Sequence, residues 1–257
     1  MTNVLVCVKR VPESSGQVQL TDDAQSIDGR YVGFTVSDHE SCAVELAVQV
    51  AAATSGTATA LTVGAEEAVE QLRSVLAVGP TAATLVETDP KALGPADVAK
   101  EIAAVVEAHR AEGRGHDLVL LGNDAADSGD FQVPVRLAYA LGVPVVTGVK
   151  TVEVSGDTVI AHGDAPDGGT ERFEVPLPAV VSVLGGGVAP PYPTIKGRMA
   201  AKKVQVETRQ PVSTPVGASR ERLTLPPAAP ANVRVLGEGP EAAAAAVDLL
   251  QELGVAR

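Results

Sequence analysis

Short apolar runs alternate with longer amphipathic stretches along the first 184 residues, and this alternation restricts the fold more than any other feature. The runs are too short for helices and end at Gly, Pro or charged residues, so they predict buried strands. Predicted strands cover residues 3–8, 57–63, 82–87, 118–121 and 179–184, and predicted helices cover 42–53, 66–78, 95–111 and 131–141. Strands and helices at this spacing form βαβ units, which indicates an α/β fold with a mainly parallel sheet and helices on both faces. Aromatic residues make up only 2% of the chain, so aliphatic side chains must fill the core.

The remaining stretches predict additions to this sheet. Residues 17–20 and 31–35 predict a short hairpin, and turns between 151 and 175 predict antiparallel hairpin strands. Residues 207–230 are rich in Pro and cannot form much core, and they precede a predicted strand at 232–236 and a helix at 240–253. We therefore divide the chain into an α/β domain at 1–206 and a C-terminal arm at 207–257 that packs on a partner chain.

Composition excludes several classes of function. The net charge of −12 argues against nucleic acid or an anionic membrane as the main partner. No apolar run approaches the length of a membrane span or a signal peptide, and two cysteines give no disulfide framework, so we expect a cytoplasmic protein. The four histidines are scattered, which makes zinc an unexpected ligand, and we expect each of them at the surface.

The loop after the predicted strand at 118–121 is the first candidate site. Loop amides and a helix N-terminus converge at such a strand end, and Gly122 would let a ligand approach the backbone closely. Polar side chains that could bind sugar hydroxyls or a base edge follow at Asn123, Asp127, Asp130 and Gln132. The same side chains could simply cap the next helix, and spacing does not separate the two interpretations.

A second candidate lies after residue 185, where the chain becomes irregular and rich in Gly and Pro. Ile195 follows Pro190, Pro191 and Pro193 and precedes a basic run at 196–203. An apolar tip on a Pro-stiffened loop predicts a docking element, since Pro reduces the entropy lost on binding. A plain linker is the alternative.

Five stretches in register resemble the beta subunit of electron transfer flavoprotein. They are the strand ending Val8-Lys9-Arg10-Val11-Pro12, the helix segment Cys42-Ala43-Val44-Glu45-Leu46-Ala47, the run from Leu72 to Gly79 after Gly64, the loop Leu121-Gly122-Asn123-Asp124-Ala125-Ala126-Asp127 with Gln132, and the segment from Pro190 to Lys203. The resemblance covers most of the chain up to about residue 206. Ser37-Asp38-His39 departs from it, since family members commonly carry an Asn-Pro-aromatic segment there.

The resemblance implies a Rossmann-like domain with a bound nucleotide that is not itself redox-active. It implies AMP in this chain, with a redox FAD held mainly by the alpha subunit of a heterodimer. Cofactor contacts carried over by position, together with those from the loop pattern, fall on Cys7, Val63, Gly122, Asn123, Ala125, Asp127, Asp130, Gln132 and Val133. The resemblance also implies docking of an acyl-CoA dehydrogenase-type donor through Tyr192, Ile195 and Met199, and delivery of electrons to a quinone oxidoreductase-type acceptor.

Three functions stay open from the sequence. The first is an electron carrier subunit without substrate chemistry of its own, which fits the lack of any recognisable pairing of a nucleophile with a base. The second is a bifurcating variant with a second FAD in place of AMP. The third is a stand-alone adenine-nucleotide sensor or hydrolase on a similar sheet.

Overall fold

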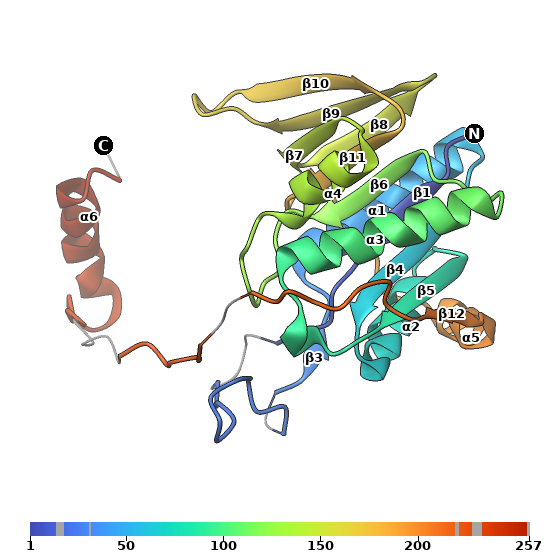
Figure 1. Cartoon of the computed structure of the whole chain (residues 1–257). Coiled ribbons are helices and arrows are strands. Elements are labelled where there is room, and N and C mark those ends of the chain that lie inside the picture. The colour runs from blue at the N-terminus through green and yellow to red at the C-terminus, as the bar shows by residue number, and fades with distance from the viewer. Residues whose placement is uncertain (14–17, 31, 219–220, 228–232, 256–257) are drawn as a thin grey trace. The chain divides into compact units, whose positions relative to one another are not determined.

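The computed structural model describes residues 1–13, 18–30, 32–218, 221–227 and 233–255, and the chain divides into two compact units, Met1–Leu223 and Thr224–Arg257. Seven strands of the first unit form one parallel sheet in the order β12-β5-β4-β1-β6-β11-β7 (Figure 1). These strands are β1 (Val4–Cys7), β4 (Ala58–Gly64), β5 (Ala82–Glu87), β6 (Leu118–Gly122), β7 (Val145–Val149), β11 (Ala179–Val183) and β12 (Val206–Arg209). The predicted α/β fold with a mainly parallel sheet is therefore confirmed.

Helices cover both faces of this sheet (Figure 1). They are α1 (Asp38–Thr54), α2 (Val69–Leu76), α3 (Pro95–Ala111), α4 (Val133–Leu141) and α5 (Ile195–Lys203), with short 3-10 turns at Glu66–Ala68 and Pro90–Ala92. Side chains alternate along β1, so Val4 and Val6 pack with α1 and α2, while Leu5 and Cys7 pack with α3 and α4. Burial on both faces explains why the strands read as continuous apolar runs.

Two small antiparallel sheets complete the first unit. The predicted hairpin strands at 151–175 form a three-stranded sheet of β8 (Thr151–Ser155), β9 (Thr158–Asp164) and β10 (Thr170–Pro176). The predicted N-terminal hairpin is wrong in its pairing. β3 (Phe34–Thr35) pairs with β2 (Val11–Pro12), and Leu20 instead bridges Ile27, while residues 17 and 31 lie outside the described residues.

Several other elements differ from the predictions. Helix α1 begins four residues earlier than expected, and the helix predicted at 66–78 opens with a 3-10 turn. Strands β7 and β12 and helix α5 were not predicted. Residues 233–236 form no strand, and residue 232 of that prediction lies outside the described part of the chain.

Helix α3 anchors the segment that follows β12. Buried Asp97 accepts hydrogen bonds from the amides of Val216 and Gly217, each at 2.9 Å. One turn later, buried Glu101 accepts from the amide of Val212 at 2.8 Å and from Ser213. The Val216 amide is the largest of the contacts that hold the pKa of Asp97 below its usual range. Residues 212–217 are therefore part of the first unit.

The prediction of surface histidines is wrong for His109, which is fully buried near the end of α3. Its Nδ1 lies 2.9 Å from Nε2 of His116, so one ring must donate and the other accept. Burial lowers the pKa of His116 to about 4, and the pair is therefore neutral at pH 7.

The second unit contains a 3-10 turn at Gly239–Glu241 and helix α6 (Ala242–Glu252), of which no residue is buried. Val247, Leu250 and Leu253 remain 49%, 42% and 64% exposed at a spacing of three. Nowhere in the described chain is a helix both long enough and apolar enough to span a bilayer.

Candidate functional site

The order of the parallel strands creates one natural crevice, between β1 and β6. From β1 the chain builds outward through β4 to β5, and it then returns to place β6 on the other side of β1. The connections after β1 and after β6 diverge at this switch point, and in open α/β sheets ligands bind outside the carboxyl ends of the strands at such a point. We call this edge of the sheet the β1–β6 crevice. The predicted cofactor residues lie along this edge of the sheet.

Register places the strand-end residues side by side. Cys7 lies opposite Leu61 of β4 and Leu121 of β6, so it sits between the two neighbouring strands. Val63 lies two residues further along β4, and Gly122 ends β6. Burial raises the pKa of the Cys7 thiol, which is therefore no nucleophile at pH 7.

Gly122 lies where the first turn of α1 approaches the end of β6. A Cβ on Gly122 would lie 2.7 Å from Cγ of Glu40 and 3.3 Å from Cβ of His39. Helix packing alone therefore requires a glycine at this position, and its contact with a ligand stays a prediction. The close approach at Gly122 brings α1 to the end of β6.

The loop that follows Gly122 is anchored at its start. The Asn123 amide donates to the Val183 carbonyl at 2.9 Å, and the Ser182 hydroxyl donates to Oδ1 of Asn123 at 2.8 Å. Ser182 is fully buried in β11 and also accepts from the amide of Gly148 at 3.1 Å. The side-chain oxygen of Asn123 is therefore already bonded to β11 through Ser182.

Further along the loop the predicted residues separate. Ala125 is half-buried, whereas Asp127 and Asp130 are on the exposed part of the loop. Gln132 precedes α4, and its Oε1 accepts from Nε and Nη2 of Arg136 at 3.0 and 2.8 Å. Val133 is half-buried as the first residue of α4. The predicted residues of the strand ends and of the first half of the loop therefore lie at the crevice. Gln132 instead contacts Arg136 of the helix that follows it.

One ion pair and one close polar contact connect the loop to the rest of the crevice. Nζ of Lys9 lies 2.6 Å from Oδ1 of Asp127, and Nδ1 of His39 lies 2.9 Å from Oδ1 of Asp124. The first joins the segment after β1 to the loop after β6, and the second joins α1 to that loop. Sequence reasoning missed Lys9 as a site residue, although its position directly after a buried strand was a usable signal.

Buried Glu40 links the segment after β1 to the start of α1 beneath the crevice. This buried carboxylate accepts from the Lys9 amide at 2.8 Å, the Ser37 amide at 3.0 Å and the Ser37 hydroxyl at 2.6 Å. Burial raises the pKa of Glu40 to about 7, although these donors and Lys9 act in the opposite direction. A Glu in a first turn normally faces solvent, whereas Glu40 is buried and forms a capping box with Ser37.

The crevice offers binding groups and no evident catalytic group. Across the described residues, no cluster of three or more His, Cys, Asp and Glu side chains could hold a metal ion. Backbone amides, a lysine and paired carboxylates can bind a polar ligand such as a nucleotide.

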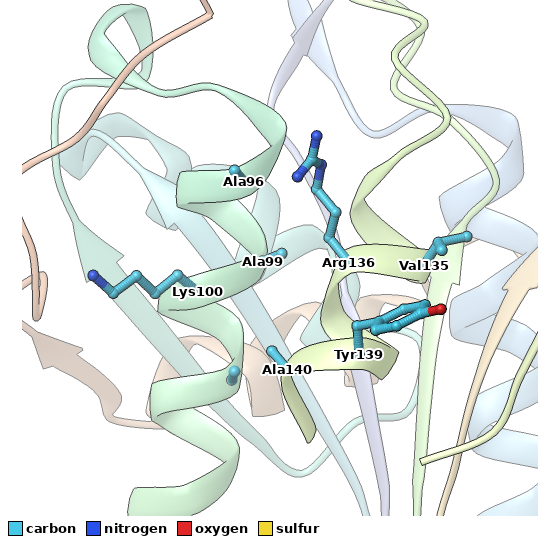
Figure 2. Close-up of a pocket in the computed structure, with 8 residues that line it drawn as sticks. Ala96, Ala99, Lys100, Val135, Arg136, Tyr139 and Ala140 are labelled. Atoms are coloured by element: carbon cyan, nitrogen blue, oxygen red, sulfur yellow. The ribbon is translucent and has the colours of Figure 1, made fainter. Parts of the chain in front are cut away.

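A separate hollow of about 400 Å³ lies between α3 and α4 (Figure 2). Figure 2 shows small alanine side chains together with Val135, Arg136 and Tyr139 of α4 around it. None of the predicted cofactor residues lines this hollow. Lys100 of α3 also lines the hollow, and in Figure 2 the polar ends of Lys100, Arg136 and Tyr139 point away from one another. The crevice therefore remains the candidate ligand site.

The predicted docking residues lie on and just before α5, away from the crevice residues in sequence. Tyr192, Ile195 and Met199 are 94%, 82% and 62% exposed. The Thr194 hydroxyl caps α5 by accepting from the Gly197 amide at 3.0 Å. Helix α5 packs on α2, where Arg73 donates to the carbonyls of Ala201 and Val204. An exposed apolar tip is thus held on a fixed helix.

Comparison with known proteins agrees with this architecture. The electron transfer flavoprotein domain matches residues 27–213. The electron transfer flavoprotein subunit beta of Syntrophomonas wolfei subsp. wolfei is 35% identical over 245 residues, which cover 91% of this chain and 90% of that protein. The subunit of the same name from Bacillus subtilis is 32% identical, with 80% and 77% covered. The acryloyl-CoA reductase electron transfer subunit gamma of Anaerotignum propionicum is 28% identical, with 76% and 73% covered. The chain therefore belongs to the electron transfer flavoprotein beta subunit family.

Proposed function

We propose that this chain pairs in the cytoplasm with an electron transfer flavoprotein alpha subunit and binds AMP in the crevice between β1 and β6. The redox FAD is held mainly by the alpha subunit, and AMP acts as a structural ligand. The heterodimer takes electrons from an acyl-CoA dehydrogenase-type donor and passes them to a quinone oxidoreductase-type acceptor. The chain contributes no substrate chemistry of its own.

The observation that carries the AMP site is the composition of the crevice. The edge formed by Cys7, Val63 and Gly122 is continuous, and the loop after Gly122 is fixed to β11 through Asn123. Asp127 is paired with Lys9, so its carboxylate does not stand as an uncompensated charge beside a phosphate. These residues support a nucleotide as the ligand of the crevice.

Helix α5 supports the docking role. Ile195 projects an apolar side chain from the start of a helix that is capped by Thr194 and fixed to α2. A single apolar anchor of this kind suits a weak complex that exchanges rapidly with its dehydrogenase partner. Tyr192 and Met199 flank it as further exposed apolar side chains.

The C-terminal unit supports the pairing role. Helix α6 carries Val247 and Leu250 on its exposed surface and buries no residue in its own unit. An apolar stripe of this kind gains stability by packing on another surface. Residues 206–217 pack on the first unit, so in this proposal the part of the arm that binds the alpha subunit is the unit Thr224–Arg257, with α6 as its apolar contact.

The test is to identify the ligands released when the chain, co-expressed with its alpha subunit, is denatured and analysed by mass spectrometry. AMP and FAD in equal amounts are expected. Two FAD without AMP would replace the AMP assignment by the bifurcating function. A chain that purifies without partner or flavin would contradict the electron carrier function and favour a stand-alone nucleotide-binding protein.

A further inference from the structure

The crevice contains more acid than a phosphate ligand would tolerate without help. The loop after β6 carries Asp124, Asp127 and Asp130, and the whole chain has a net charge of −12. Like charges at short range raise the free energy of a bound phosphate. A cation that faces the ligand would offset this repulsion, and the positions of the nearby cations show which one is free to do so.

Two arginines near this edge already have other partners. The Arg136 guanidinium donates two hydrogen bonds to Oε1 of Gln132 and lines the hollow between α3 and α4 (Figure 2). The Arg10 guanidinium lies 3.4 Å from the centre of the Phe34 ring, in a cation–π contact. Moving either group to a ligand would break these contacts.

Lys9 is placed differently. It follows β1 by two residues, and its backbone amide is fixed by Glu40. Its side chain remains 37% exposed and crosses from the β1 side of the crevice to Asp127 on the β6 side. An ammonium group has three N–H donors, and Asp127 accepts one of them at 2.6 Å. The remaining donors are available on the side open to solvent.

We propose that Lys9 binds the phosphate of the nucleotide in the β1–β6 crevice, and that Asp127 holds its ammonium in position. This inference rests on the proposed AMP site and assigns the residue that distinguishes a nucleotide from a nucleoside. Lys9 binds only the phosphate, so its loss weakens the binding of AMP and leaves the binding of adenosine unchanged. A purely structural role for Lys9 would weaken both ligands together.

The experiment measures AMP and adenosine binding by calorimetry to the full chain co-purified with its alpha subunit, after bound nucleotide has been removed. Lys9→Met is compared with the wild type, with Lys9→Arg as the charge-conserving variant. Lys150→Met is the matched control, because Lys150 forms a similar ion pair with Asp164 at 2.5 Å and is 36% exposed. Thermal unfolding shows whether each variant is folded, and Lys9→Gln replaces Lys9→Met if the latter is not.

Lys9→Met should raise the Kd of AMP by about tenfold or more, while the Kd of adenosine changes by less than about twofold. Lys9→Arg should retain most of the preference for AMP, and Lys150→Met should change neither ligand. Equal weakening of AMP and adenosine, or unchanged AMP binding, would overturn the role of Lys9 alone. A wild type that binds neither AMP nor adenosine would overturn the AMP site itself and this inference with it.

Discussion

Glu40 joins the segment after β1 to the start of α1 through a carboxyl group that is costly to ionise where it lies. Its pKa is raised from 4.5 to about 7 by burial. A raised folded-state pKa means that the protonated acid is favoured by folding, so this contribution is complete below the unfolded-state pKa and is lost as pH rises through about 7. The free energy of unfolding should therefore contain a term from Glu40 that falls between about pH 5 and pH 8.

Glu40→Gln should remove this pH dependence. From about pH 5 to pH 8, the free energy of unfolding of the variant minus that of the wild type should rise by roughly 2 to 3 kcal/mol. Altered hydrogen bonds should add a difference that does not depend on pH. Urea unfolding at several pH values measures the difference. Glu45→Gln is the control on the same helix, since Glu45 contacts Gln49 on the exposed side. Parallel pH profiles for Glu40→Gln and the wild type would show that Glu40 does not titrate in this range.

The site could be predicted from sequence only in part. The strand end at Gly122 was visible because an apolar run stops there and a polar loop follows. The partners of that loop were not visible, because Lys9 and His39 come from segments far away in sequence and reach it only through the strand order. The close approach of Glu40 to Gly122 was not visible either, because no local pattern shows it.

At the scale of elements, α5 depends on one glycine. A Cβ on Gly197 would lie 2.2 Å from the carbonyl oxygen of Ala77 at the end of α2. Ala favours a helix over Gly by about 1 kcal/mol, but the two helices must move apart to accommodate the methyl group, at a cost of roughly 1 to 3 kcal/mol. Gly197→Ala should therefore lower the thermal midpoint, and an unchanged or higher midpoint would show that the contact with α2 gives way easily.

Ile195→Ala separates the docking function from stability. Because Ile195 is 82% exposed, its loss should change the free energy of unfolding by no more than about 0.5 kcal/mol. Under the proposed docking role, reduction of the heterodimer by its dehydrogenase should slow by about tenfold, the equivalent of about 1.4 kcal/mol. Stopped-flow kinetics measure this, with Lys196→Ala as the control in the same turn. Unchanged kinetics would remove Ile195 from the interface.

Elements were predictable where local signals and burial agree. Helix α3 has the predicted bounds because Pro95 starts it and apolar residues recur at helical spacing up to Ala111. Strand β12 was missed because Glu207 and Arg209 break the apolar pattern, and it forms by pairing with β5 at the sheet edge. Helix α5 was missed because Gly197 and few apolar residues weaken its pattern, while contact with α2 and the Thr194 cap stabilise it.

At the scale of the whole molecule, the place where the chain can be shortened is set by α3. A chain that ends at Leu223 keeps β12 and the donors that Val212 to Gly217 supply to Asp97 and Glu101. A chain that ends at Val206 leaves both buried carboxylates without most of their donors and removes most of β12. The shorter chain should lose at least about 2 kcal/mol of stability, while the longer one should stay close to the stability of the intact chain.

Urea unfolding of the two shortened chains measures this difference, and co-purification with the alpha subunit measures pairing. Under the proposed role of the arm, both chains should pair less well than the full chain. Similar stability of the two chains would show that residues 207–223 add little to the first unit. Full pairing by the chain that ends at Leu223 would contradict the role of α6.

The central place of β1 has a consequence for biosynthesis. β1 is made well before its neighbour β6, which begins only at Leu118. Until β6 is made, the apolar segment from Val4 to Cys7 has an unpaired edge, which is a template for wrong pairing. Strand pairs so distant in sequence also form slowly. The nascent chain must therefore be protected from aggregation between the synthesis of β1 and that of β6.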